Sequence, residues 1–315
     1  MTPSNPPYQT TIRRYGKAAI AEAADLIRGG YPVAVPTETV YGLAADATSG
    51  EAVARIYEAK GRPSFNPLIV HVLDLAAAEQ LGVFSAEALA LAAAHWPGPL
   101  TLVVPRHPDC PVAGLATAGL DTIAIRVPAH RAMRALLEAT GLPLAAPSAN
   151  ASGRISPTRA SHVEHSLAGR IQLIIDDGPA SVGIESTIVL AEPGALRILR
   201  AGPVAIDGAS VAQSPIDPAS VIAPGQLTSH YAPAKPLRLN AEKARDDEWM
   251  IGFGQVSGDA NLSLDGSLLQ GAARLFDELH IADQSDRHAI AVARIEGDSA
   301  LAVAINDRLN RAASA

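Results

Sequence analysis

Cysteine is almost absent from this chain, and its scarcity excludes two common kinds of structural crosslink. Cys110 is the only cysteine among 315 residues. An internal disulfide is therefore impossible, and a zinc site that needs several cysteines is excluded. The nine histidines are dispersed along the sequence in a pattern that predicts no metal site.

Charged and aromatic side chains are also few. Charged residues make up 18% of the chain, aromatic residues 4%, and the net charge is -7. Tight binding to nucleic acid needs clustered lysine and arginine, and binding to single strands needs aromatic side chains on which bases stack. We therefore expect no stable nucleic-acid binding, while a local basic pocket for a nucleotide is compatible with this composition.

Long apolar runs are missing as well. No run approaches the roughly 18 consecutive apolar residues that a membrane-spanning helix needs. Residues 1–16 are polar and rich in proline, unlike the apolar core of a signal peptide. We expect a cytoplasmic protein without a membrane partner, whose core is built from the small aliphatic residues that dominate its hydrophobic fraction of 48%.

Several common catalytic signatures are not found. The sequence contains no G-x-x-x-x-G-K-[ST] loop, no G-x-G-x-x-G after a strand, no G-x-S-x-G and no H-E-x-x-H. These absences disfavour a P-loop kinase, a Rossmann dehydrogenase and a zinc hydrolase.

Apolar runs and amphipathic stretches alternate between about residues 17 and 205. Their spacing predicts helices over 17–27, 51–60, 85–95, 131–139 and 161–167. It predicts strands over 32–35, 68–73, 100–104, 122–127, 144–146, 171–175, 187–190 and 196–199. Strands and helices mixed in this order favour an α/β architecture with a mixed sheet.

The composition changes near residue 206. Five prolines between 207 and 236 predict an extended linker. A second block, 237–315, follows, with strands expected over 248–253 and 288–293 and helices over 267–279 and 299–312. We therefore expect a large α/β domain over 1–206 and a small one over 237–315.

The segment 36–47 (PTETVYGLAADA) is the most informative stretch of the chain. A short strand stops at Pro36 and leads into hydroxyl, carboxylate and phenol side chains. Unpaired polar groups beside a buried strand are costly. Contact with a ligand explains them, and so does a turn in which the threonines and the glutamate satisfy local backbone groups.

Two further pairs of positions are suited to anion binding. Lys60 and Arg62 flank a glycine at a predicted helix end, where they either cap the helix or bracket a triphosphate. Ser148 and Asn150 lie in a loop of small polar residues after an apolar run. Such loops bind phosphate or ribose, but they also form ordinary turns.

His71 and Arg126 lie on predicted strands. By alternation His71 shares a face with Ile69, which is typical of a core histidine unless a partner is present. Arg126 lies opposite the apolar face of its strand, where a permanent charge needs either an internal carboxylate or an anionic ligand. Ser186, just before the strand 187–190, either donates to a ligand or caps the turn.

Taken together, these segments resemble the threonylcarbamoyl-AMP synthase family, in its two-domain form with a YrdC-like catalytic domain. The matching segments are PTETVYGLAADA, KGRPSFNPLIVHV, WPGPLTLV, IAIRVPAH, PLAAPSANASG, VGIESTIV, ILRAGP and PGQLTSHYAP. They occur in family order and span nearly the whole chain. Each alone is weak evidence, but eight in register are specific.

The resemblance implies a twisted sheet with a concave ligand cavity, a linker over 207–236 that closes over the active site, and an accessory domain. It implies a nucleotidyltransferase that joins ATP, L-threonine and bicarbonate into threonylcarbamoyl-AMP and releases pyrophosphate. Mg2+ would be bound mainly through phosphate oxygens. The product would pass to a tRNA threonylcarbamoyltransferase complex, which modifies the adenosine beside the anticodon.

The resemblance also assigns roles to individual residues. Its nucleotide-binding set consists of Lys60, Arg62, Ser148 and Asn150, with Arg200 also facing the nucleotide, and Lys60 and Arg62 assist catalysis. Its threonine pocket consists of Thr37, His71, Arg126 and Ser186, with Tyr41 nearby. The closing linker contributes His230 and Tyr231.

Three other functions fit parts of the sequence. An RNA-binding module would use the concave surface without catalysis, but the acidic composition disfavours it. A carbamoyl-transfer enzyme of hydrogenase maturation has a related domain, yet such proteins carry cysteine clusters that this chain lacks. A regulatory protein would bind nucleotide without threonine-dependent consumption of ATP.

Overall fold

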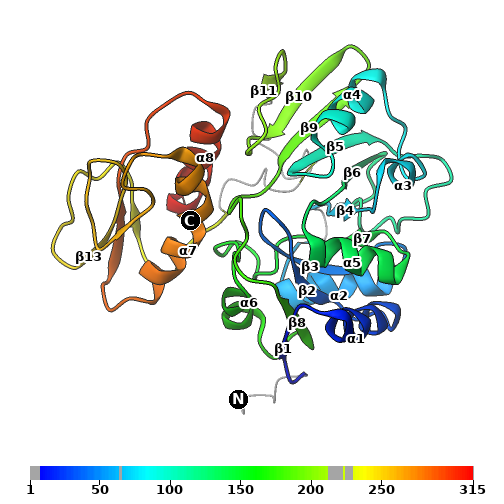
Figure 1. The fold of residues 1–315 in the computed structure, drawn as a ribbon, viewed down its shortest axis with the longest axis horizontal. Coiled ribbons are helices and arrows are strands. Elements are labelled where there is room, and N and C mark those ends of the chain that lie inside the picture. The colour runs from blue at the N-terminus through cyan, green and yellow to red at the C-terminus, as the bar shows by residue number, and fades with distance from the viewer. Residues whose placement is uncertain (1–7, 64–65, 212–222, 224–229, 315) are drawn as a thin grey trace.

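The structure is a computed structural model that describes residues 8–63, 66–211, 223 and 230–314. Two units lie side by side, a larger one that begins at the N-terminus and a smaller one that ends at the C-terminus (Figure 1). The larger unit contains a mixed sheet flanked by helices, and the smaller unit has a parallel sheet of its own. The α/β class and the second, smaller α/β unit expected from the sequence are confirmed.

The larger unit is organised around an eleven-stranded sheet. Its strands are β1 (Thr11–Arg14), β2 (Val33–Pro36), β3 (Tyr41–Asp46), β4 (Ile69–His71), β5 (Leu100–Pro105), β6 (Thr122–Arg126), β7 (Leu144–Ala145), β8 (Leu173–Asp176), β9 (Thr187–Glu192), β10 (Ala195–Arg200) and β11 (Ser210–Val211). Across the sheet they follow the order β1-β8-β2-β3-β7-β4-β6-β5-β9-β10-β11. Neighbours such as β4 and β6 are parallel, whereas β5 and β6 are antiparallel.

Helices cover both faces of this sheet, and its strands accordingly carry buried residues on both sides. On one face, Val33 and Val35 pack with α1 (Lys17–Arg28) and α5 (Arg131–Thr140). On the other face, Ala34 packs with α2 (Gly50–Lys60), α4 (Ala86–His95) and α6 (Ala160–Leu167). A short helix, α3 (Leu75–Glu79), follows β4.

The predicted helices and strands of the larger unit are found close to their expected bounds. The sequence did not reveal β1, β3, α3 or β11. The segment 36–47 is a hairpin in which β2 pairs antiparallel with β3, so its second half continues the sheet instead of forming a loop. Burial on both sides explains the miss, since β3 reads as small apolar residues without alternation.

The smaller unit is a four-stranded parallel sheet with two helices. Its elements are β12 (Leu237–Arg238), β13 (Glu248–Gly252), β14 (Ala260–Asn261), α7 (Leu268–Gln284), β15 (Ala289–Val292) and α8 (Ala300–Ala313). The strand order is β12-β15-β13-β14. Both predicted strands and both predicted helices of this region are present.

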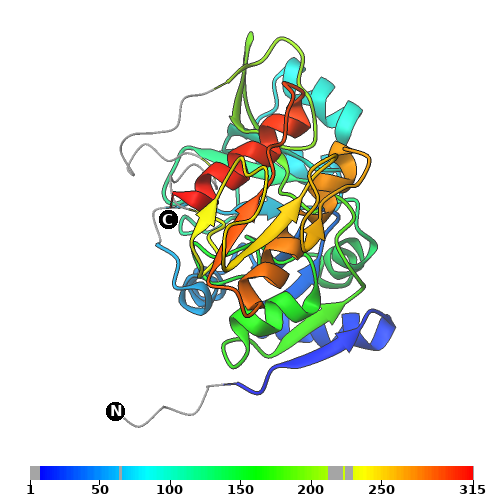
Figure 2. The same ribbon diagram turned by 90° about the vertical axis from the view of Figure 1, so that its left-hand side faces the viewer.

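The two units share one apolar cluster. Side chains of α7, α8 and the small sheet pack with Val40, Ile155, Ile184 and Tyr231. The view in Figure 2 looks onto the smaller unit, which lies in front of the larger one. This shared cluster means that the smaller unit supports segments of the larger one directly.

The predicted domain bounds stay predictions. Strand β11 extends the large sheet past residue 206, and residues 212–222 and 224–229 of the predicted linker lie outside the described residues. Within the described part of the chain, no helix combines the length and the apolar character needed to cross a membrane.

Candidate active site

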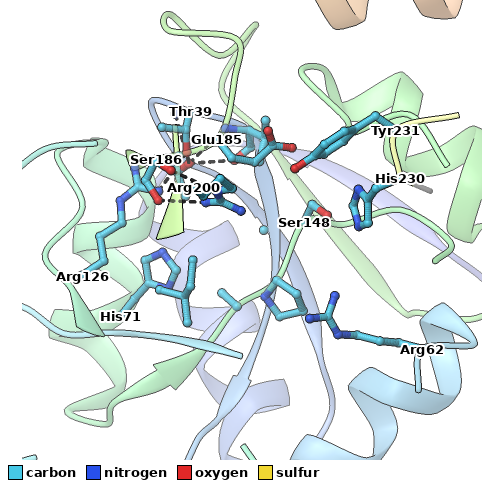
Figure 3. A pocket seen from close by; sticks show the side chains of 16 residues that line it. Thr39, Arg62, His71, Arg126, Ser148, Glu185, Ser186, Arg200, His230 and Tyr231 are labelled. Carbon is cyan, nitrogen blue, oxygen red and sulfur yellow. Dashed lines mark hydrogen bonds between the residues drawn. The ribbon is translucent and has the colours of Figure 1, made fainter. Parts of the chain in front are cut away.

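A small polar cavity lies on the face of the large sheet where β4 and β6 end. It is lined by side chains from the turn after β2, from β4 and β6, from the loop around Ser148, from residues 185 and 186, and from His230 and Tyr231. Figure 3 shows Arg126 and His71 on one side of this cavity and Arg62, His230 and Tyr231 on the other. Segments far apart in the sequence therefore meet at one site.

The register of two parallel strands brings His71 and Arg126 together. Ile69 pairs with Ala124, and His71 pairs with Arg126 at the ends of β4 and β6. Side chains two residues apart share a face, so His71 and Ile69 both point into the cavity, as the alternation predicted. Burial, reinforced by the charge of Arg126, lowers the pKa of His71 to about 3. His71 is thus a neutral imidazole in the physiological range, and its Nδ1 lacks a partner among the described residues.

Arg126 already has an internal counter-ion. Its Nη2 donates to Glu38 Oε1 at 2.5 Å, its Nη1 to Thr39 Oγ1 at 2.9 Å and its Nε to the Gly98 carbonyl at 3.1 Å. Burial alone would raise the pKa of Glu38, but Arg126 holds it below its ordinary value. Of the two options left open by the sequence, the internal salt bridge is present. A substrate carboxylate would have to share the guanidinium with Glu38.

Thr37 and Tyr41 illustrate the two interpretations of the segment 36–47. The hydroxyl of Thr37 donates to the Val40 carbonyl at 2.7 Å and accepts from the Thr39 amide, so it stabilises the turn, yet Thr37 also lines the cavity. Tyr41 does not line the cavity. Its hydroxyl donates to the Gly178 carbonyl at 2.7 Å. Its neighbours Val40 and Gly42 line the cavity, while its ring packs in the core, so a part for Tyr41 in the threonine pocket stays a prediction.

Ser186 lines the cavity and is hydrogen-bonded to Thr101 and Arg200. Its hydroxyl is hydrogen-bonded to that of Thr101 at 2.7 Å and accepts from Nη2 of Arg200 at 3.1 Å. Arg200 Nε also donates to the Ser186 carbonyl at 3.0 Å. Burial lowers the pKa of Arg200. Arg200 therefore links the predicted threonine pocket to the predicted nucleotide site.

Lys60 and Arg62 are both buried at the end of α2. The helix begins with Ser49 as its N-cap and ends at Gly61, whose φ of 61° terminates it in the left-handed conformation. Lys60 Nζ donates to the backbone carbonyls of Ser148 and Asn150, each at 2.5 Å. The sequence-based grouping of these three residues thus corresponds to direct contacts.

Arg62 lines the cavity, whereas Lys60 lies beneath the Ser148 loop. Arg62 Nη2 donates to the Pro67 carbonyl at 3.1 Å. Burial, together with nearby Arg200, lowers the pKa of Arg62 to about 10, and burial next to Arg62 lowers that of Lys60 well below its ordinary value. An anion in the cavity would therefore meet the guanidinium of Arg62 directly and would favour the protonated form of Lys60 behind it. The side chain of Asn150 instead donates to the backbone at Ala151 and is not among the lining residues.

His230 and Tyr231 face this cationic group. Their rings meet edge to face with centroids 4.2 Å apart. Burial and the neighbouring charges of Arg62 and Lys60 lower the pKa of His230 well below its ordinary value. The Tyr231 hydroxyl and His230 Nδ1 have no hydrogen-bond partner among the described residues. Buried polar atoms without partners indicate a place for a polar ligand.

Two carboxylates at the site were not singled out from the sequence: Glu185, which lines the cavity, and Glu38, which accepts a hydrogen bond from Arg126. Glu38 lies inside the segment 36–47 and Glu185 directly precedes Ser186. The signal that could have found them is a carboxylate adjoining a predicted anion site, because a buried arginine requires such a partner. The described residues contain no group of three or more histidine, cysteine or acidic side chains placed to hold a metal ion.

The fold and the site define a class: a two-unit α/β protein whose mixed sheet carries a buried basic pocket, lined in part by His230 and Tyr231 from the segment before its C-terminal unit. Residues 25–202 match the Sua5, YciO and YrdC family, described as Telomere recombination, and residues 194–314 match the family described as Threonylcarbamoyl-AMP synthase, C-terminal domain. The chain belongs to the two-domain threonylcarbamoyl-AMP synthase family, as the sequence segments indicated.

Individual relatives agree with this placement. The chain is 47% identical to the threonylcarbamoyl-AMP synthase of Bacillus subtilis over 233 residues, which cover 70% of this chain and 66% of that protein. It is 39% identical to that of Pyrococcus abyssi over 92% of both chains. The crystal structure of P. abyssi Sua5 complexed with L-threonine superposes with a TM-score of 0.86 at 35% identity, covering 98% of this chain and 97% of that one.

Proposed function

We propose that this protein is an L-threonylcarbamoyladenylate synthase. It would join L-threonine, bicarbonate or CO2 and ATP into threonylcarbamoyl-AMP and pyrophosphate, which makes it a nucleotidyltransferase. The observation that carries the proposal is one cavity that is lined by the arginines Arg62, Arg126 and Arg200 and by the neutral His71. The relative from P. abyssi, crystallised with L-threonine, supports the amino-acid substrate.

The reaction brings two anions together. The threonine amine first combines with CO2, or with bicarbonate with loss of water, to give a carbamate. A carbamate oxygen then forms a bond to the α-phosphorus of ATP, while the bond from that phosphorus to the bridging oxygen breaks and pyrophosphate leaves with its negative charge. The protein must therefore offset repulsion between the carbamate and the polyphosphate.

The cationic side of the cavity is suited to the polyphosphate. We assign Arg62 and Arg200 to the phosphates, and Lys60 to the support of the Ser148 loop against the same group. A bound polyphosphate would favour the charged form of Lys60, whose protonation burial now opposes. Placing these charges before the substrate arrives lowers the reorganisation needed in the transition state.

The opposite side is suited to threonine. We assign Arg126 to the carboxylate, shared with Glu38, and Thr37, His71 and Ser186 to the orientation of the amine and hydroxyl. His71 offers a neutral nitrogen without a partner, which avoids repulsion of the ammonium form of the substrate. Orientation is expected to contribute most, because a carbamate is short-lived in water.

His230 and Tyr231 would close the site. The cavity they cover measures about 50 Å³, far below the several hundred Å³ of a site for a ligand of nucleotide size. ATP therefore requires these two side chains to move outward and then return. Their return would exclude water from the carbamate.

Mg2+ would accompany ATP. Among the described lining residues, Glu185 carries a carboxylate, which already accepts a hydrogen bond from Arg308. The carboxylate of Glu38, which does not line the cavity, accepts one from Arg126. A divalent cation would therefore be held by phosphate oxygens and water, where it would neutralise charge on the phosphates. The chain's own residues would carry the remaining tasks.

The product would serve a tRNA threonylcarbamoyltransferase complex that modifies adenosine beside the anticodon. That role places the protein in the cytoplasm. The decisive assay measures pyrophosphate release with threonine and bicarbonate omitted in turn. Release that needs both supports the proposal, and release that needs neither contradicts it.

The division of roles is tested by two substitutions. Lys60→Ala should cripple turnover and leave threonine binding largely intact, whereas Arg126→Ala should weaken threonine far more than ATP, both measured by calorimetry. Because Arg126→Ala also strands a buried carboxylate, the double variant Arg126→Ala with Glu38→Gln is the matched control for stability. Equal loss of both substrates in each variant would refute the assignment.

A further inference from the structure

Arg308 is a fully buried cation of the smaller unit that lies behind the wall of the cavity. It lies on α8, and its side chain has an exposed fraction of 0%. Burial alone would lower the pKa of Arg308, but Tyr231, Glu185 and Asp307 together raise it. A charge held this far from water is stable only because oxygens surround it.

The guanidinium of Arg308 joins two segments of the larger unit. Nε donates to Glu185 Oε2 at 3.1 Å, and Nη2 to the Glu185 carbonyl at 3.4 Å. Nη1 donates to the Ala201 carbonyl at 2.6 Å and to Asp307 Oδ2 at 3.1 Å. The planar fork of arginine permits this simultaneous contact, which the single ammonium of lysine does not reproduce.

In each segment, the residue that Arg308 contacts is adjacent in sequence to a residue that lines the cavity. Glu185 precedes Ser186, and Ala201 follows Arg200. On the cavity side, two hydrogen bonds from Arg200 to Ser186 join these segments. On the opposite side, Arg308 joins the same two segments through Glu185 and Ala201. Figure 3 shows Glu185, Ser186 and Arg200 together at one edge of the cavity.

The same arginine also backs the ring of Tyr231. Its Cζ lies 5.6 Å from the ring centroid of Tyr231, which also contacts Phe276 of α7 at a centroid distance of 5.5 Å. The His230 amide donates to the Arg311 carbonyl of α8. The smaller unit thus contacts His230 and Tyr231 as well as the segments around Glu185 and Ala201.

Resting on the function proposed above, we propose that Arg308 is a positioning residue for this reaction: it aligns Ser186 and Arg200 through Glu185 and Ala201, and it supports Tyr231. The accessory unit accordingly supports the active-site wall from outside the cavity. Arg308 itself does not line the cavity, so its influence passes through those neighbours.

The interface supplies a matched control. Arg159 and Asp277 form a bidentate pair between the units, with both distances 2.7 Å, and neither residue lines the cavity. Arg308→Met and Arg159→Met each remove one arginine from the same interface. Only the first should alter the cavity wall. Arg308→Lys keeps the charge and tests the need for the fork.

The experiment measures kcat and KM for threonine and for ATP by pyrophosphate release, with circular dichroism and thermal unfolding to establish the folded fraction. We expect kcat/KM to fall about 10- to 100-fold in folded Arg308→Met, as for misplacement of reacting groups, and about 10-fold in Arg308→Lys. Arg159→Met should lower Tm and leave kcat/KM unchanged. If Arg308→Met fails to fold, Arg308→Lys decides.

Amide hydrogen exchange of residues 184–187 and 199–202 gives a readout independent of turnover. Exchange in both segments should accelerate in the Arg308 variants and stay unchanged in Arg159→Met. Unchanged exchange with normal kcat/KM in folded Arg308→Lys overturns the inference, as does an equal loss in Arg159→Met. An inactive wild-type protein would refute the proposed function instead. Amide hydrogen exchange in the Arg308 variants would then be the only test of whether Arg308 holds the two segments together.

Discussion

Buried neutral histidines predict a loss of stability in mild acid, and His280 allows the effect to be isolated. His280 lies on α7 at the interface between the units, where its ring stacks on His162 of α6 at 3.9 Å. It also faces His165, Asp277 and the Ser156 carbonyl, to which its Nε2 is hydrogen-bonded at 3.2 Å. Burial, together with His162, lowers the pKa of His280 from 6.5 to about 3.

The direction of the effect follows from proton uptake. Above pH 6.5 neither the folded nor the unfolded protein binds this proton. As the pH falls from 6.5 towards 3, only the unfolded state takes it up, so the free energy of unfolding decreases. At pH 5.0 the difference for His280 is about 2 kcal/mol, from 1.36 kcal/mol per pH unit over 1.5 units.

The assay compares urea unfolding at pH 7.5 and pH 5.0. We expect His280→Gln to lose about 2 kcal/mol less than the wild-type protein between these conditions. His288→Gln, whose side chain is 88% exposed in the folded protein, is the control and should behave as the wild type does. An equal loss of stability in wild type and His280→Gln would refute the reasoning, because it would mean that His280 is protonated in the folded state.

Three further substitutions test contacts described above. Tyr41→Phe removes a hydrogen bond to the Gly178 carbonyl and should lower stability by about 1 kcal/mol without changing threonine affinity. Weaker threonine binding in calorimetry would instead show that the Tyr41 hydroxyl takes part in the threonine pocket. Gly183→Ala should destabilise by about 1–3 kcal/mol, because Gly183 has a φ of +79° and a Cβ there would lie 2.4 Å from the backbone of α7; an unchanged Tm would contradict this. Glu38→Gln should cost about 3–5 kcal/mol by stranding Arg126, and urea unfolding that matches the wild type would show the pair to be dispensable.

Much of the site was predictable because local patterns carried the information. The end of a helix placed Lys60 and Arg62 together, and strand alternation placed Arg126 opposite the apolar face of its strand. Alternation also paired His71 with Ile69, and both residues line the cavity. No local pattern gave the direction of the Tyr41 side chain, because β3 lacks a visible alternation.

What the sequence by itself determined is the α/β class, the positions of most helices and strands, and the residue types that an anion site requires. These depend on periodicity and composition, which act over a few neighbouring residues. Only the tertiary structure decided the partners: Glu38 for Arg126, the Ser148 loop for Lys60, and Glu185 for Arg308. Such pairs join residues about 90 to 120 positions apart, and no local pattern encodes a contact that forms only when separate strands and a second unit pack together.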